Sequence, residues 1–436
     1  MIPTKRLLLL VALGIPLAAL FGQLGQADLF FWGYNLLLLA TAVTTYYLAP
    51  SGKSLRLSRK MDAVLSVRAA NRIELRLRND GLERLEGQIR DEPPPLFKAS
   101  RKEFDLSLGP GAEKEISYIL TPNERGADYF RGAYVRLKCP LGLVWRQQKV
   151  PAAQPVRVYP NILALREFDL LKQRGRLNEV GIRKSRARGL GMEFESLRDY
   201  GEGDDYRKVD WKASARRGKL VVREYEQEKN QTVIVIVDVG RHMMAEVNGV
   251  RKLDRALDAC LMLLHAAALE GDLVGLMVYS DRVSRYIPPR KGRAQIGVIL
   301  NAIHDLIAEP VESDPVKAMA FLATRYKRRS LLVIFSDLDG PDGASAFAAG
   351  LGPVSRRHLA VVARVADPKL LTSYDQTITD SVALFERTAA DFLIADRRKA
   401  SSVLTAAGLH SLEADPDQLA AALVNFYFVV KDKALL

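Results

Sequence analysis

Carboxylates follow two strand-like runs of this chain, and they are the side chains best placed for chemistry. Thr232–Val237 is an unbroken apolar, β-branched run that ends on Asp238, and a second run, Leu331–Phe335, is followed by Ser336 and Asp337. In doubly wound sheets ligands bind beyond the carboxyl ends of the strands, so both carboxylates are expected at that edge. Their oxygens suit a hard cation such as Mg²⁺. The alternative is that they cap helices and accept hydrogen bonds from nearby backbone amides.

A second candidate constellation is the stretch from Gly191 to Gly218, which is dense in charge and still patterned. Glu193–Tyr200 alternates as a strand does, and Asp204 suits the N-cap of a helix that runs through Lys212–Arg217. Gly218 suits the left-handed position after that helix. The pattern predicts strand, turn and short helix, followed by a return strand over Leu220–Tyr225.

The charged side chains of this stretch allow two interpretations. Asp204, Asp205 and Asp210 could hold a metal, but no His or Cys lies near them, and Arg207 and Lys208 intervene. We therefore expect a structural charge network with Arg198, Arg207 and Arg216, or a partner-binding surface, and we expect Trp211 in the core. The residues of this predicted network or surface are Glu193, Arg198, Tyr200, Asp204, Asp205, Arg207, Asp210, Trp211, Lys212 and Arg216.

The rest of the sequence shows no catalytic motif. A phosphate-binding loop is missing, because Gly201-Glu202-Gly203 lacks the glycine and lysine that such a loop places next. The five histidines are scattered, and no serine sits in a G-x-S-x-G elbow. The sequence therefore predicts a protein that is not an enzyme.

The charged stretch resembles the signature of the domain of unknown function 58 family, bacterial proteins in which this pattern precedes a von Willebrand factor type A (vWA) domain. The matching residues are Gly191, Glu193, Phe194, Leu197, Arg198, Tyr200, Gly203, Asp204, Asp205, Arg207, Asp210, Trp211, Lys212, Ala215 and Arg216, with Val209 in place of the usual isoleucine. The resemblance implies a vWA-like domain after the signature. Proteins that look like this commonly accompany MoxR-type AAA+ ATPases, so it also implies such an ATPase as partner, acting on an unknown protein client.

A vWA domain carries a metal site whose first loop reads Asp-x-Ser-x-Ser, with a later Thr and Asp. This sequence departs from that pattern, because Gly240 and His242 replace both serines after Asp238. Asp337 fits the last Asp, and Ser313 is the candidate for the Thr. A degenerate site of Asp238, Ser313 and Asp337 offers at most three protein oxygens, so we expect no required cofactor, with Mg²⁺ as the only candidate.

The first fifty residues are the most apolar part of the chain. Leu7–Leu24 and Leu29–Ala49 are each long enough to span a membrane, and aromatic residues lie near the two ends of the second. Lys and Arg precede the first span and follow the second, but the link has none, so both termini and the soluble domains are expected in the cytoplasm of a multi-pass inner-membrane protein. A cleaved signal peptide with one anchor is the alternative.

The remaining pattern predicts the domain organisation. Short strand-like runs with Gly and Pro turns indicate an antiparallel, immunoglobulin-like β-sandwich, and alternating strands and helices indicate a doubly wound α/β domain. The predicted domains are a transmembrane hairpin at 1–52, a β-sandwich at 53–160, a basic connector with the signature at 161–230, and a vWA-like domain at 231–436.

Composition bounds the partners and the compartment. The net charge of +13 favours anionic partners, including the inner leaflet of a membrane. The run of Arg183, Lys184, Arg186 and Arg188 could bind lipid phosphate or nucleic acid, but a solvated linker is the simpler interpretation, and nucleic acid is not an expected partner. The two cysteines fall in different predicted domains, as in a protein of a reducing compartment.

Overall fold

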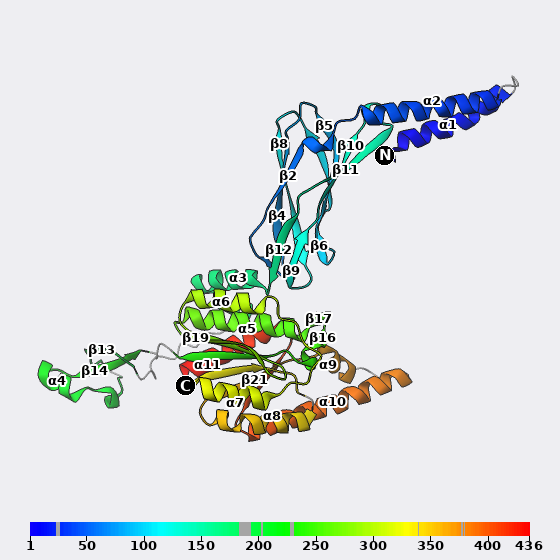
Figure 1. The fold of residues 1–436 in the computed structure, drawn as a ribbon. Coiled ribbons are helices and arrows are strands. Elements are labelled where there is room, and N and C mark those ends of the chain that lie inside the picture. The colour runs from blue at the N-terminus through cyan, green and yellow to red at the C-terminus, as the bar shows by residue number, and fades with distance from the viewer. Residues whose placement is uncertain are drawn as a thin grey trace. The chain divides into compact units, whose positions relative to one another are not determined.

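The computed structural model describes residues 1–22, 27–182, 193–201, 204–226, 231–338, 340–375, 378 and 380–436. The chain divides into two compact units, Met1–Asn161 and Ile162–Leu436 (Figure 1). The finer divisions expected near residues 53 and 231 stay predictions.

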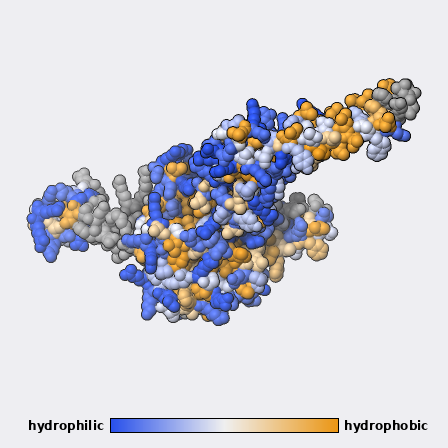
Figure 2. Space-filling model, turned by 45° about the horizontal axis from the view of Figure 1, so that its top comes forward, coloured by the Kyte–Doolittle hydropathy of each residue, from blue (hydrophilic) through white to orange (hydrophobic). Residues whose placement is uncertain are grey.

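Two helices open the first unit, α1 (Lys5–Gly22) and α2 (Ala27–Tyr47). They leave large apolar side chains exposed, and Figure 2 shows this pair as a largely hydrophobic surface. Among the described helices, the segment Asp28–Ser54 is the one long and apolar enough to cross a membrane. The structure therefore contains one candidate membrane helix near the N-terminus.

The first unit continues in sheets whose strand pairs are antiparallel, apart from the parallel pair formed by residues 65–66 and 158–159. Its short helical turns are η1 (Gly52–Ser54) and η2 (Pro140–Gly142). A five-stranded sheet has the order β1 (Ile2–Pro3), β11 (Val144–Val150), β10 (Gly132–Lys138), β5 (Leu85–Glu92), β7 (Glu103–Leu108). A four-stranded sheet has the order β2 (Leu55–Lys60), β4 (Asn71–Asn79), β8 (Glu113–Pro122), β6 (Phe97–Ala99). A third has the order β3 (Leu65–Ser66), β12 (Gln154–Tyr159), β9 (Gly126–Phe130).

These sheets enclose one apolar core because their strands alternate. Strand β4 buries Ile73, Leu75 and Leu77 while the residues between them face outward, and β10 contributes Val135 to the same cluster. The short strand-like runs expected in this region, such as Ile73–Leu77 and Tyr134–Leu137, lie within or overlap observed strands.

The second unit is built on a six-stranded sheet with the order β19-β18-β15-β20-β21-β22. All neighbours are parallel except β18 and β19. The strands are β15 (Thr232–Asp238), β18 (Leu273–Tyr279), β19 (Val283–Arg290), β20 (Leu331–Phe335), β21 (Leu359–Val365) and β22 (His410–Ala414). The expected α/β domain is present as a sheet with helices on both faces.

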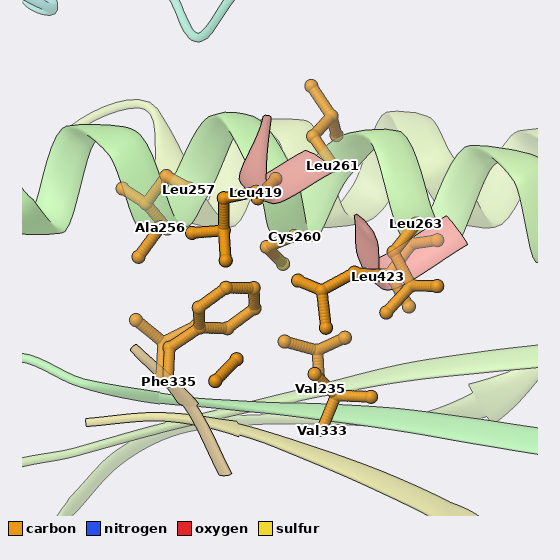
Figure 3. Close-up of a cluster of buried hydrophobic side chains, with 14 of the residues drawn as sticks. Val235, Ala256, Leu257, Cys260, Leu261, Leu263, Val333, Phe335, Leu419 and Leu423 are labelled. Atoms are coloured by element: carbon orange, nitrogen blue, oxygen red, sulfur yellow. The ribbon is translucent and has the colours of Figure 1, made fainter. Parts of the chain in front are cut away.

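Alternate residues of the central strand β15 point into two separate cores. Val235 packs with α5 and α11 on one face, and Ile236 packs with α7, α8 and α10 on the other. Figure 3 shows the first core, where Val235 and Phe335 lie below Cys260 of α5. The helices are α3 (Ile162–Gln173), α5 (Lys252–Leu269), α6 (Arg293–Ile303), α7 (Pro315–Arg325), α8 (Gly340–Ser355), α9 (Pro368–Asp375), α10 (Ser381–Ala406) and α11 (Leu419–Asp432).

Two parts of the second unit differ from expectation. The connector expected after residue 161 begins with helix α3 and the turn η3 (Leu177–Val180), because Leu165 and Phe168 lie one turn apart and pack on the core. Strand β19 was not expected, since Pro288 and Pro289 argue against a central strand. It lies at the edge of the sheet, where missing N–H donors are tolerated.

A buried charge cluster ties the last helix to the sheet. The Lys431 ammonium of α11 lies 2.8 Å from the Asp272 carboxylate, which also accepts a 2.5 Å hydrogen bond from the Tyr427 hydroxyl. The Asp272 side chain is fully buried and that of Lys431 is 5% exposed. Burial and the adjacent carboxylate raise the pKa of Tyr427, so it stays a donor at neutral pH.

Removing the ammonium should be costly because it leaves a buried carboxylate without its cation. We expect Lys431→Met to lower the free energy of unfolding by about 3 kcal/mol or more. Chemical denaturation of the full chain measures it. Lys433→Met changes an exposed lysine at the end of the same helix and should leave stability nearly unchanged. Equal stability of both variants would show that the cluster contributes nothing.

Candidate functional site

The carboxyl ends of β15 and β20 form a polar site. These neighbouring strands lie where the strand order reverses direction along the sheet, which is where doubly wound folds bind ligands. A small cavity of about 120 Å³ lies there, and its polar lining includes Asp238, Tyr279, Ser313, Ser336 and Asp337. The structure thus brings the three expected residues of the degenerate metal site to one cavity.

Asp238 is buried and is fully engaged by protein donors. Its Oδ1 accepts hydrogen bonds from the Gly240 amide at 2.8 Å and the Ser313 hydroxyl at 2.5 Å, and its Oδ2 accepts one from Ser336 at 2.7 Å. Burial raises the pKa of Asp238, while these donors oppose that rise. The carboxylate is therefore stabilised by neutral groups in place of a cation.

Gly240 leaves no space for the serine that a vWA metal loop has at this position. A Cβ on Gly240 would lie 2.0 Å from Ser313 Oγ and 3.0 Å from the Val311 carbonyl oxygen. The Ser313 hydroxyl thus occupies the space of the missing side chain. This packing gives a physical reason for the glycine at the place of the first serine in the vWA pattern.

Asp337 is neutralised by a lysine of the protein itself. Lys252, the first residue of α5, directs its ammonium to Asp337 Oδ2 in an ion pair. The two side chains are only 9% and 23% exposed, respectively. A cation is therefore already built into the site, next to the carboxylate that a vWA domain would use for its metal.

These contacts do not fit a divalent metal. Mg²⁺ needs near-octahedral oxygen ligation, but Asp238 is occupied by three donors and Asp337 by an ammonium. Across the part of the chain that the structure describes, no group of three or more His, Cys, Asp or Glu side chains is placed to hold a metal ion. The retained carboxylates at this edge form a hydrogen-bonded and ion-paired site.

The rim of the site carries a second ion pair. Arg241 Nε lies 2.7 Å from Glu312 Oε2, and His242 Nε2 lies 3.7 Å from the other oxygen of Glu312. The positive charge of Arg241 is thus paired with Glu312. This exposed pair offers a partner protein both signs of charge.

Sequence reasoning missed three residues of this site: Lys252, Tyr279 and Ser336. Ser336 had a visible signal, because it directly precedes Asp337 after a strand. Tyr279 is opposite Asp238 in the strand register, and burial together with that carboxylate raises its pKa. Lys252 had no signal in the sequence, since only the packing of α5 brings it to Asp337.

The signature segment forms a small hairpin unit. Strand β13 (Glu193–Asp199) pairs antiparallel with β14 (Val221–Glu226), and the turn η4 (Tyr206–Lys208) and helix α4 (Trp211–Arg217) lie between them in the chain. The backbone of Glu193 pairs with Glu226. Gly191, Gly203 and the basic run at 183–188 lie outside the described residues.

Asp204 fixes the turn after β13. Its carboxylate accepts two hydrogen bonds from the Arg198 guanidinium, at 2.8 and 2.6 Å, and one from the Gly201 amide at 2.8 Å. The Arg198 hydrogen bond is the largest cause of a lowered Asp204 pKa. The expected pairing of Arg198 with Asp204 is present, but Asp204 is not the N-cap of α4.

Asp210 is the N-cap of α4. Its Oδ1 accepts the Ala213 amide at 2.9 Å, and its Oδ2 accepts Arg223 Nε at 2.9 Å from β14. The backbone hydrogen bond and then Arg223 lower the pKa of Asp210. The sequence pointed to Arg216 as a partner, but Arg223 faces Asp210 from the adjacent strand, while Arg216 is exposed in the last turn of α4.

The other signature residues take separate places in the hairpin. Asp205 caps η4 by accepting the Arg207 amide, and the Tyr200 ring lies 5.4 Å from that of Tyr206. Trp211 is 63% exposed, which corrects the expectation of a core residue, because a seven-residue helix buries little more than Ser214. Arg207 and Lys212 are exposed. An exposed tryptophan among charged side chains is typical of a contact surface.

Residues 196–372 match the model of DUF58, a family described as proteins of unknown function. The chain carries a DUF58 domain. The match covers the hairpin from residue 196 onward and most of the six-stranded sheet, including Asp238, Lys252, Ser313 and Asp337.

Relatives of the DUF58 domain are themselves uncharacterized. Protein Rv1480 of Mycobacterium tuberculosis is 26% identical over 183 residues, which cover 42% of this chain and 57% of that protein. Protein YeaD of Bacillus subtilis is 27% identical over 123 residues, or 28% of this chain and 30% of that protein. The matches thus span little more than half of the relatives' length at most.

A solved structure aligns with about a quarter of the chain. The CARDB domain of the PF1109 protein from Pyrococcus furiosus is 20% identical and covers 24% of this chain and 86% of its own. The TM-score is 0.18. A value this low carries no conclusion about fold or function.

The N-cap role of Asp210 can be tested locally. We expect Asp210→Ala to lower hydrogen-exchange protection of residues 211–217, because α4 loses its capping acceptor and the pairing with Arg223. Lys212→Ala is the matched control and should keep it. Because folding lowers the pKa of Asp210, its stabilisation is present above the unfolded pKa and is lost as pH falls through the folded pKa. Protection factors that stay constant down that pH range would contradict this role.

Proposed function

We propose that this chain is a membrane-anchored binding or adaptor protein without enzymatic activity. The observation that carries the proposal is the ion pair of Lys252 with Asp337 beside the fully bonded Asp238. The site keeps the position of a ligand-binding edge, but its polar groups already satisfy one another. Such an arrangement suits recognition of a partner by direct protein contacts and leaves no activated group for a reaction.

The second unit is proposed to be a vWA-like domain. Its doubly wound sheet and the polar residues at the reversal point of the strand order support this assignment. The partner follows from the family resemblance alone: a MoxR-type AAA+ ATPase in assembly, maturation or stress handling of a protein client. The exposed Trp211 and the Arg241–Glu312 pair are the surfaces we assign to such contacts.

Membrane anchoring by two spans is the second element of the proposal. Exposed leucines on both α1 and α2 support it. Lys5 and Arg6 are the first two residues of α1, and Lys53, Arg56 and Lys60 follow α2, which supports cytoplasmic ends under the positive-inside rule. Arg59 does not belong to this flank, because its guanidinium is buried in an ion pair with Asp91.

A metal-dependent hydrolase built on Asp204, Asp205 and Asp210 is the alternative that the geometry disfavours. Arg198 engages Asp204 and Arg223 engages Asp210, so both carboxylates already have cationic partners. A membrane-tethered nucleic-acid binder would use the basic run at 183–188. Steeply salt-dependent DNA binding would support that third function.

Topology is checked with reporter fusions. A fusion placed after residue 60 should report the cytoplasm, since Lys and Arg flank the two apolar helices and are missing from their link. A fusion in the link near residue 26 should report the opposite side. A periplasmic signal after residue 60 would overturn both the orientation and the ATPase partnership.

The metal-free adaptor is tested by affinity capture of the full chain from bacterial membranes. We expect an AAA+ ATPase to co-purify equally with and without millimolar EDTA, and the melting temperature to be insensitive to Mg²⁺ or Mn²⁺. A cation that bound only the folded state would raise that temperature by mass action.

The control for that experiment is Asp238→Ala. A metal-dependent rise in melting temperature that this variant abolishes would show a working metal site and contradict the proposal. Hydrolytic activity that depends on the same metal would support the hydrolase. Capture without any ATPase would remove the proposed partner and leave the binding role without support.

A further inference from the structure

A larger cavity lies at the same edge of the sheet, away from Asp238. It has a volume of about 540 Å³ and lies beyond the carboxyl ends of β21 and β22, beside helices α9 and α10. Ligand pockets in proteins commonly measure about 300–1,000 Å³. Its lining includes three large apolar side chains and three arginines, together with three carboxylates; the apolar residues and arginines are Leu370, Leu371, Ile394, Arg364, Arg397 and Arg398.

Arg364 is the buried cation of this cavity. It lies on β21 directly opposite Glu413 of β22, and its guanidinium Nη2 lies 3.0 Å from Glu413 Oε2 in an ion pair. The side chain is only 4% exposed, and its Nε has no hydrogen-bond partner within the described part of the chain. A buried charged donor without an acceptor is costly, so an acceptor oxygen entering the cavity would be favoured.

Two of the three carboxylates in the lining have protein donors. Glu413 is shared, because Arg397 of α10 donates to its other oxygen at 2.8 Å. Asp367 accepts the Lys369 amide at the start of α9. The third, Asp415, precedes α11, and the positive end of that helix favours its charge. Arg398 lies exposed in the lining, and no ion pair with it is present among the described residues. Arg364 Nε and Arg398 are thus available to one further anion.

The apolar part of the lining indicates that the rest of the ligand is apolar. Leu370 and Ile394 are half-buried in the lining, and Leu371 is 54% exposed. Helix α10 also exposes Phe392 and Leu393 immediately before Ile394. An inorganic anion would use the arginines alone, whereas a carboxylate joined to an apolar group would use both halves of the cavity.

We propose that this cavity binds a carboxylate attached to an apolar group, as found at the end of a polypeptide chain with an apolar last residue. Arg398 and the free Arg364 Nε–H receive the carboxylate, and Leu370, Leu371 and Ile394 pack on the apolar side chain. The assignment is independent of the adaptor function, because it uses none of the residues at Asp238.

The test is fluorescence anisotropy with the full chain in lipid nanodiscs. The probes are a labelled hexapeptide that ends in Ala-Leu-Val with a free carboxylate, and the same peptide as its C-terminal amide. Octanoate as competitor distinguishes the source of the ligand, because it carries the same two chemical features without a peptide. We expect the acid to bind at least roughly tenfold more tightly than the amide, since a hydrogen bond to a charged group is lost.

Arg398→Ala should weaken acid binding by roughly tenfold, because it removes one charged donor and disturbs no recorded contact. Arg387→Ala changes another exposed arginine of α10 outside the cavity and should leave binding unchanged. Arg364→Met should also weaken binding, with folding checked by thermal melting.

Each outcome decides the assignment. Displacement of the peptide by octanoate supports the shared chemistry and points to small carboxylates as a second source. Equal binding of acid and amide, no binding of either probe or of octanoate, or an equal loss in Arg387→Ala would overturn it. Because no ion pair of Arg398 is present among the described residues, Arg398→Ala should melt at the temperature of the unchanged chain, and that measurement separates a binding loss from unfolding.

Discussion

The complete burial of strand β15 is the constraint on which the second unit depends. All seven of its residues are buried, with one core on each face and a parallel strand on each side. A carboxylate at the end of such a strand has little water, so the protein must supply its hydrogen bonds. Ser313, Ser336 and the Gly240 amide do so for Asp238.

The same constraint explains why the site differs from a metal centre. Once Ser313 occupies the space above Gly240, the loop has no room for a serine ligand there. Lys252 then supplies the positive charge that Asp337 requires. An ammonium differs from a divalent cation because it has no open coordination position for a ligand. Under the proposed adaptor function, recognition at this edge would use the surface around the site, where Arg241 and Glu312 are exposed.

The DUF58 signature divides into two kinds of residue. Arg198, Asp204 and Asp210 stabilise the hairpin. The Asp204 carboxylate accepts hydrogen bonds from Arg198 and from the Gly201 amide, and the Asp210 carboxylate accepts one from the Ala213 amide. Trp211 and Lys212 are exposed and do not belong to the buried part of the hairpin. A motif dense in charge can thus combine local folding with a surface that remains free for a partner.

The sequence by itself determined the order of elements and their local chemistry. Three features could be predicted because they depend on residues adjacent in the sequence. They are the apolar β-branched run before Asp238, the alternation in β4 and the glycine after α4. Ser313 could be named as a partner of Asp238 only by analogy. Helix α3 and the edge strand β19 were not predicted, because their sequence patterns are short or interrupted by prolines.

Only the tertiary structure decided which charges meet. Lys252 and Asp337 are 85 residues apart, and Asp210 meets Arg223 across a hairpin in preference to Arg216 on its own helix. The arginine-lined cavity likewise joins β21, β22, α9 and α10. Side-chain charges act through space at a few ångströms, whereas sequence patterns report only the periodicity of one element. Ion pairs between distant elements are therefore the part of this site that no reading of the sequence alone could supply.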